Sequence, residues 1–134
     1  MDRTDKALTV FPYRQDAQGL LFPLIPLRFH VGKMRIDSSA LIDSGATVSI
    51  FKTDVATHLQ LEIEKGKEIY LGGVGGHIKG YQHELEIEVA VKKFVCPIVF
   101  SREYLVSFNL LGRQAFFNRF TIVFVGKRSL LKLE

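Results

Sequence analysis

Apolar and polar residues alternate along most of the chain, and this pattern predicts an all-β fold. The clearest case is segment 83–91, in which Leu85, Ile87, Val89 and Val91 would face a core while three glutamates face water. Other strand-like segments are 20–31, 34–36, 40–42, 48–51, 68–71, 78–81, 94–100, 121–125 and 130–133, and segment 7–13 is either an edge strand or a partner-binding arm.

Helical spacing is rare in this sequence. Segment 52–61 has Val55, Ala56 and Leu59 on one side, and Thr53 is placed to cap it. We therefore expect a closed or nearly closed barrel-like sandwich with one or two short helices. A second short helix is expected after Gly112, with three phenylalanines facing the core: Phe116, Phe117 and Phe120.

The length of 134 residues fits one domain, 1–134, with a core at about 23–125, an N-terminal extension 1–19 and a C-terminal tail 126–134. The hydrophobic fraction of 47% is too high for a disordered chain. The apolar run 20–27 is short and contains two prolines, so it cannot span a membrane. Segment 1–6 is charged and no signal-type apolar run follows it, so we expect a cytoplasmic protein without membrane contact.

The net charge and the candidate metal-ligand residues give little further evidence about function. The net charge of +4 is scattered, so a nucleic-acid-binding β-barrel is a weak alternative, and we expect no nucleic-acid partner. Cys96 lies in an apolar run and is expected to be a buried small hydrophobe. The four histidines show no zinc-ligand spacing with one another or with Cys96, so no metal and no cofactor are expected.

The candidate for chemistry is Asp43. It lies between two apolar segments, 40–42 and 48–51, and is followed by Ser44, Gly45 and Ala46. A carboxylate between buried strands is costly unless nearby groups hold it, and small residues let backbone N–H groups approach it. An ordinary Asp-Ser-Gly turn is an equally simple reading of these residues alone.

Asp37 provides a comparison. It is also followed by small polar residues, but the segment before it, 33–36, is only alternately apolar. We expect Asp37 to be a solvated turn or strand-edge residue.

A glycine-rich segment follows at 70–81, where two strand-like arms flank Gly72, Gly73, Gly75 and Gly76. This pattern is typical of a flexible hairpin, and a simple floppy loop is the alternative. The dinucleotide fingerprint is not met, because Ile78 stands where its third glycine should be, and there is no P-loop Lys-Ser/Thr pair.

Three landmarks therefore occur in order: Leu41-Ile42-Asp43-Ser44-Gly45-Ala46, the glycine-rich hairpin, and Leu110-Leu111-Gly112-Arg113. In this arrangement the chain resembles the retropepsin-like aspartic proteases over residues 23–125. The resemblance implies a catalytic Asp43, an active-site support and a structural second motif. It also implies a flap that contacts substrate. The support would be Ser44, Gly45 and Ala46, the second motif Leu110, Leu111, Gly112 and Arg113, and the flap residues Gly72, Gly73, Val74, Gly75, Gly76 and Ile78.

The resemblance also implies a partner. Aspartic proteases use two carboxylates that share one proton around a water, and this chain has one such motif. The implied protein is a homodimeric endopeptidase with two copies of Asp43 on the axis, acting on peptides or proteins. The alternative is a catalytically silent peptide-binding or dimerisation module. Thr47 replaces an Asp that pairs with the Arg in viral members, so Arg113 should need a different partner.

Overall fold

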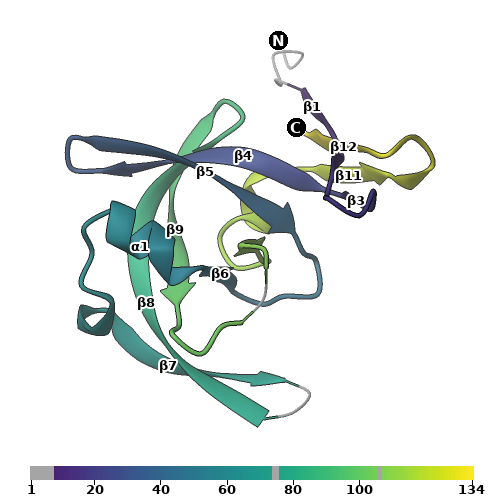
Figure 1. Ribbon diagram of the computed structural model, residues 1–134. Coiled ribbons are helices and arrows are strands. Elements are labelled where there is room, and N and C mark those ends of the chain that lie inside the picture. Colours follow the sequence, from purple (N-terminus) through teal and green to yellow (C-terminus); the bar gives the residue numbers. More distant parts are fainter. Residues whose placement is uncertain (1–7, 74–75, 106) are drawn as a thin grey trace.

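A ring of six strands forms the body of the molecule in the computed structural model, which describes residues 8–73, 76–105 and 107–134 (Figure 1). The ring closes because β4 pairs with β8 as well as with β5. The predicted all-β, barrel-like fold is therefore confirmed. In ring order the strands are β4 (Leu24–Val31), β5 (Met34–Ile42), β10 (Leu110–Leu111), β6 (Ser49–Phe51), β9 (Lys92–Phe100) and β8 (Gly76–Val89), and β7 (Lys67–Gly73) is added outside β8.

The alternating pattern of β8 is borne out by burial. Leu85, Ile87 and Val89 are buried, and the glutamates between them lie toward solvent. The expectation for Val91 is wrong, because the chain has already turned toward β9 and the Val91 side chain is 69% exposed. Ala90 in this turn has a φ of 55°, which shows how tightly the hairpin closes.

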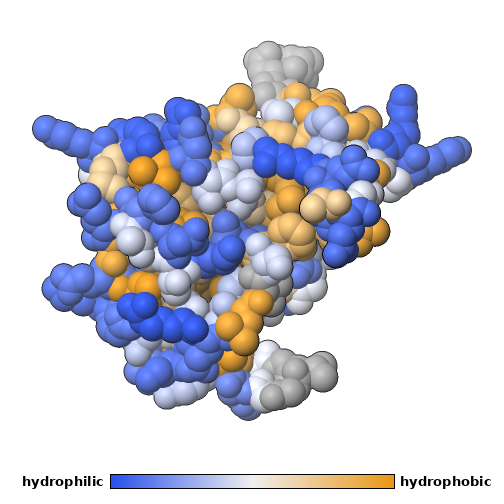
Figure 2. All heavy atoms as spheres, in the orientation of Figure 1, coloured by the Kyte–Doolittle hydropathy of each residue, from blue (hydrophilic) through white to orange (hydrophobic). Residues whose placement is uncertain are grey.

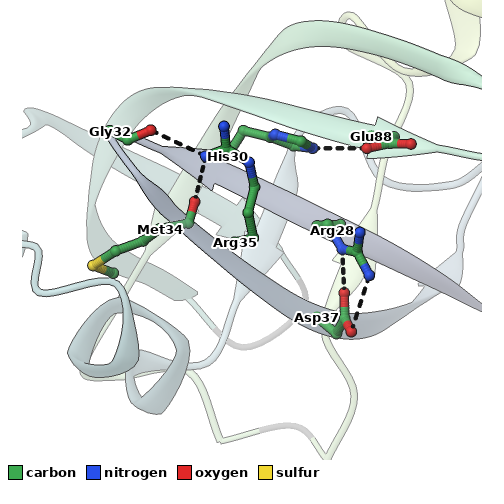
Figure 3. A network of polar contacts seen from close by, with 7 residues as sticks. All are labelled: Arg28, His30, Gly32, Met34, Arg35, Asp37 and Glu88. Atoms are coloured by element: carbon green, nitrogen blue, oxygen red, sulfur yellow. Dashed lines mark hydrogen bonds and ion pairs between the residues drawn. The ribbon is translucent and has the colours of Figure 1, made fainter.

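Strand β5 is longer than expected. Segments 34–36 and 40–42 belong to one nine-residue strand, which pairs with β4 from Met34 to Leu41. Asp37 is therefore in mid-strand opposite Arg28, and their side chains form an exposed ion pair at 2.7 Å (Figure 3). The same figure shows His30 bonded to Glu88 on β8, with 2.7 Å between Nε2 and Oε1.

The helices are shorter than expected. Helix α1 (Thr53–His58) begins after Lys52, and Thr53 is not its cap, so that prediction is wrong. The Asn109 side chain instead accepts the Lys52 N–H at 2.8 Å. The expected helix after Gly112 is a turn followed by the single 3-10 turn η3 (Phe117–Arg119), and η2 (Ile63–Lys65) is another such turn. No helix within the described ranges is long and apolar enough to cross a membrane.

The two ends of the chain meet in a separate three-stranded sheet, which we call the terminal sheet. Its order is β1 (Thr9–Pro12), β12 (Leu130–Leu133) and β11 (Ile122–Val125), so segment 7–13 contributes an edge strand. The turn η4 (Gly126–Arg128) connects β11 to β12. Leu131 and Leu133 are buried beneath the sheet. A small hairpin of β2 (Arg14–Gln15) and β3 (Leu21–Phe22) leads from β1 to the barrel.

Candidate active site

Asp43 is the first residue after β5, and the Leu110-Leu111-Gly112 motif lies directly beside it. Strand β10 is parallel to β5 and antiparallel to β6, so it separates the two strands that flank Asp43. The Asp43 backbone N–H donates to the Leu111 carbonyl at 3.0 Å. The sequence motifs around Asp43 and Gly112, far apart in the chain, are thus hydrogen-bonded neighbours.

The turn after Asp43 holds its carboxylate. The Gly45 N–H donates to Asp43 Oδ1 at 2.9 Å, and the Ala46 N–H donates to the Asp43 carbonyl at 3.2 Å. A Cβ at position 45 would lie only 3.2 Å from Oδ1, so a small residue keeps this approach open. Asp43 is half-buried, and Oδ2 accepts no hydrogen bond from the residues that the structure describes. One oxygen is therefore fixed, and the other is available to a ligand.

Gly112 passes under the loop between Asp43 and β6. A Cβ at position 112 would lie 2.3 Å from the Val48 carbonyl oxygen and 2.7 Å from that of Ala46. No side chain fits at such distances, because the contacts are with backbone atoms. Glycine is required here by packing, which gives the Gly in the second motif a physical role.

Ser49 is a site residue that the sequence pattern missed. Segment 48–51 was predicted as an apolar strand, but Val48 and Ile50 are only half-buried and Ser49 is fully buried beside Phe51. The Ser49 hydroxyl accepts the Gly112 N–H at 3.0 Å. The reason is the pleat of β6, which turns residues 49 and 51 to the same side.

Arg113 is exposed and forms hydrogen bonds with the same loop. Its guanidinium donates to the Ser44 carbonyl at 2.7 Å and to Thr47 Oγ1 at 3.2 Å, and its backbone N–H donates to the Ala46 carbonyl at 2.8 Å. Arg113 was expected to need a partner other than an Asp side chain, and the Ser44 carbonyl is such a partner. The Thr47 hydroxyl also accepts a hydrogen bond from Arg113, so the loop is bonded to Arg113 although position 47 has no carboxylate.

Tyr104 belongs to the surroundings of Asp43, and no sequence signal marked it. Burial and the charge of Asp43 raise the pKa of Tyr104 to about 12. Its hydroxyl donates to the Phe108 carbonyl at 2.8 Å, which ties together the loop before β10. Segments 101–105 and 107–109 show no apolar periodicity, so individual hydrogen bonds such as this one position them.

The glycine-rich hairpin is formed by β7 and the start of β8, with Gly73 opposite Gly76 and Leu71 opposite Ile78. Gly76 has a φ of 123°, a conformation that favours glycine. Val74 and Gly75 lie outside the described residues. Figure 1 shows the hairpin reaching toward the same side of the molecule as the end of β5.

The base of the hairpin is anchored by the loop that carries Tyr104. Buried Ser101 donates its hydroxyl to the Lys79 carbonyl at 2.5 Å and accepts the Glu103 N–H at 3.1 Å. The Glu103 carboxylate in turn accepts the Lys79 N–H at 3.3 Å. The hairpin and the surroundings of Asp43 are thus connected through one short segment.

Two surface hollows lie elsewhere on the molecule. Their volumes are about 850 and 500 Å³, both include residues of β5, and Asp43 lines neither of them. In the part of the chain that the structure describes, no three His, Cys, Asp or Glu side chains gather as metal ligands would. The chemistry available at Asp43 is that of a carboxylate and backbone donors.

Comparison with protein-family models identifies a family for this chain. The model of a protein family described as aspartyl protease matches residues 25–114, which include the Asp43 motif, the hairpin and the Gly112 motif. No curated protein matches the chain.

Proposed function

The chain belongs to the aspartyl protease family, and from this membership we propose that it is an aspartic endopeptidase that works as a homodimer. The observation that carries the proposal is the geometry of Asp43. The Gly45 N–H holds one carboxylate oxygen at 2.9 Å, and the close packing of Gly112 under the loop that follows Asp43 fixes that loop. An Asp-Ser-Gly sequence occurs once in the chain, so a second catalytic carboxylate has to come from a second copy.

In the proposed dimer, the two Asp43 carboxylates share one proton. Two like charges at close range cannot both ionise easily, so one of the two carboxylates keeps its proton. The ionised carboxylate takes a proton from the attacking water, while the protonated one donates to the oxygen of the scissile carbonyl. Ser44, Gly45 and Ala46 support the pair, and no metal or cofactor takes part.

The hairpin is proposed to be a flap over an extended peptide. The sequence supports this role, because its four glycines have no side chains that would separate the hairpin backbone from a bound peptide. Val74 and Ile78 are proposed to contribute apolar contacts beside the cleaved bond. The link from Ser101 to Lys79 supports this role, because it joins the base of the flap to the loop near Asp43.

Asp43→Asn tests the proposal. The purified protein is incubated with a peptide library between acid and neutral pH, and the products are read by mass spectrometry. Asn retains the shape and the Oδ1 acceptor but cannot act as a base, so cleavage should fall by at least about a thousandfold. Asp37→Asn is the matched control, because Asp37 is exposed and paired with Arg28, and it should leave the rate within a few fold.

Two results would contradict the proposal. Wild-type protein that binds peptides but never cleaves them would establish the silent peptide-binding module instead. Full activity in Asp43→Asn would remove Asp43 from the mechanism.

A further inference from the structure

The larger of the two surface hollows lies where the terminal sheet meets the barrel, and its volume is about 850 Å³. Strand β4 pairs with β8 only from Arg28 to His30, and β8 ends at Val89. Beyond that end, the first half of β4 has no strand beside it on this side among the described residues, and the hollow lies there. On the face shown in Figure 2, apolar and charged side chains lie next to one another along this boundary, in the upper part of the view. A hollow of this size between two structural units is typical of a small-molecule site.

Three charged side chains from neighbouring strands form one row in the wall of the hollow. Arg28 of β4 is opposite Asp37 of β5 on one side and opposite Glu88 of β8 on the other. A row of exposed charges is by itself an ordinary solvated surface. This row is different because other side chains hold its charged groups in place.

Asp37 holds the Arg28 guanidinium, and His30 holds the Glu88 carboxylate (Figure 3). Arg28 Nε donates to Asp37 Oδ1 at 2.7 Å, and Nη2 lies 3.5 Å from Oδ2. The His30 side chain is only 8% exposed, and its Nε2 is 2.7 Å from Glu88 Oε1. The hydrogen bond with His30 lowers the pKa of Glu88, which keeps the carboxylate ionised at neutral pH. Within the described ranges, Arg28 Nη1 and Glu88 Oε2 form no hydrogen bond, so one oriented donor and one oriented acceptor are left for a ligand.

The other walls of the hollow add a second arginine and apolar side chains. Arg14 of β2 lines the hollow, so the site holds two arginines and two carboxylates. A ligand with one charge of each sign matches this set better than a simple anion or a simple cation does. Phe11 of β1 is half-buried, and Val91, in the turn after β8, is 69% exposed. Both offer apolar surface that a bound ligand would cover.

We propose that this hollow is a second binding site, which takes short apolar peptides with free termini. The α-amino group of the peptide donates to Glu88 Oε2, and its terminal carboxylate accepts hydrogen bonds from Arg28 Nη1 and from Arg14. The apolar side chains of the peptide pack against Phe11 and Val91.

The inference does not rest on the proposed protease, because Asp43 does not line the hollow. It does have a meaning for that function. Each cut by an endopeptidase creates one new carboxyl terminus and one new amino terminus, so short products of cleavage are the peptides that this site suits.

Matched dipeptides test the two polar contacts. The wild-type protein is titrated with the dipeptide Leu-Leu, and binding is followed by the amide chemical shifts in NMR spectra. Resonances of segments 9–14, 26–28 and 88–91 should move. N-acetyl-Leu-Leu lacks the charged amine and Leu-Leu-amide lacks the carboxylate, so each should bind at least about tenfold more weakly than Leu-Leu. The Asp43→Asn protein should bind Leu-Leu as the wild type does.

Variants of the protein assign each contact to its residue. Glu88→Gln should bind Leu-Leu no better than N-acetyl-Leu-Leu, because the partner of the amine has lost its charge. The double variant Arg14→Gln/Arg28→Gln should no longer distinguish Leu-Leu from Leu-Leu-amide. Glu86→Gln is the matched control, because Glu86 is exposed on the same face of β8 but does not line the hollow, and it should keep both preferences. Circular dichroism checks that the variants are folded, and the comparison of dipeptides on the wild type does not depend on them.

The results for the hollow and for the protease are independent of each other. If the three dipeptides bind equally well, or if Leu-Leu moves the resonances around Asp43 instead of those of the hollow, the second site is wrong and the protease stands. If Leu-Leu moves no resonance at all, the second site is also wrong. A wild-type protein that cleaves nothing, but binds Leu-Leu in the hollow with both preferences, would remove the protease and leave the second site.

Discussion

Gly112 is the residue at which the two motifs of the site touch. Its Cα passes so close to the Val48 carbonyl that an added Cβ would lie at 2.3 Å, and backbone cannot move aside as a side chain can. We expect Gly112→Ala to lower the free energy of unfolding by about 3 kcal/mol or more. Urea unfolding measures this change.

The control for this prediction is Gly126→Ala. Apart from position 126 and its two chain neighbours, no atom of the described residues lies within 4 Å of a Cβ added there. The midpoint of urea unfolding of Gly126→Ala should therefore stay close to that of the wild type. A Gly112→Ala protein as stable as Gly126→Ala would mean that the loop over Gly112 is not held as described.

Cys96 gives a prediction with a defined pH window. Burial raises the pKa of its thiol to about 11, whereas a thiol in an unfolded chain ionises near pH 8.5. Above pH 8.5 the unfolded state loses its proton first, so the free energy of unfolding falls as pH rises, until the folded thiol also ionises near pH 11. The expected slope from this group is about 1.4 kcal/mol per pH unit.

Cys96→Ala isolates that slope. The difference in unfolding free energy between wild type and Cys96→Ala should be constant below pH 8 and should change steadily between pH 9 and 11. The same burial predicts that a thiol reagent at pH 8 reacts slowly with the folded protein and rapidly in urea. Fast labelling of the folded protein would show that Cys96 is accessible.

The flap can be tested at its base. Ser101→Ala leaves the Lys79 carbonyl and the Glu103 N–H without their shared partner, which costs about 1–3 kcal/mol for each buried group left unpaired. Hydrogen exchange in segment 76–82 should become at least about tenfold faster. Because a loosened flap weakens substrate binding, KM should rise more than kcat falls.

Ser107→Ala provides the control, since Ser107 is exposed on the same loop. A pepstatin-bound wild-type protein should show slower exchange at 72–76 than the free protein. If exchange at the tip were already slow without inhibitor, the hairpin would not act as a flap.

Elements with strong local patterns could be predicted from the sequence, and those that depend on distant partners could not. The alternation of β8 and the apolar segments beside Asp43 identified the strands. The single strand β5 was missed because Asp37, Ser38 and Ser39 look like a break, although pairing with β4 keeps them extended. The contact that holds the start of α1 was missed because it comes from Asn109, 57 residues away, which accepts the Lys52 N–H.

The same distinction applies to the candidate site. Asp43 and Gly112 carry motifs that the sequence analysis recognised, and the structure brings these two motifs together. Ser49 contacts Gly112, which is far along the chain, and a polar residue in an apolar strand gives no sign that it is buried. Tyr104 is close enough to Asp43 for the charge of Asp43 to raise its pKa, although the two residues are far apart in the sequence. Nor does local sequence show that the two ends of the chain pair in one sheet.

At the scale of the whole molecule, the proposed mechanism makes the dimer the unit of activity. Each catalytic pair needs one Asp43 from each subunit, so a dimer with one Asp43→Asn subunit lacks half of the pair and should be inactive. Asn preserves the Gly45 contact and the packing of the loop, so the variant should still exchange freely into mixed dimers. Equal amounts of wild-type and Asp43→Asn protein are mixed and allowed to exchange, and cleavage is followed at a fixed amount of wild-type chain. About a quarter of the dimers are then wild-type on both sides, so the rate should fall to about half of that without the variant. Adding Asp37→Asn protein in place of Asp43→Asn should raise the rate instead, because those chains remain active. A rate that is unchanged by Asp43→Asn, in a sample shown by mass spectrometry to contain mixed dimers, would mean that each subunit carries out catalysis alone.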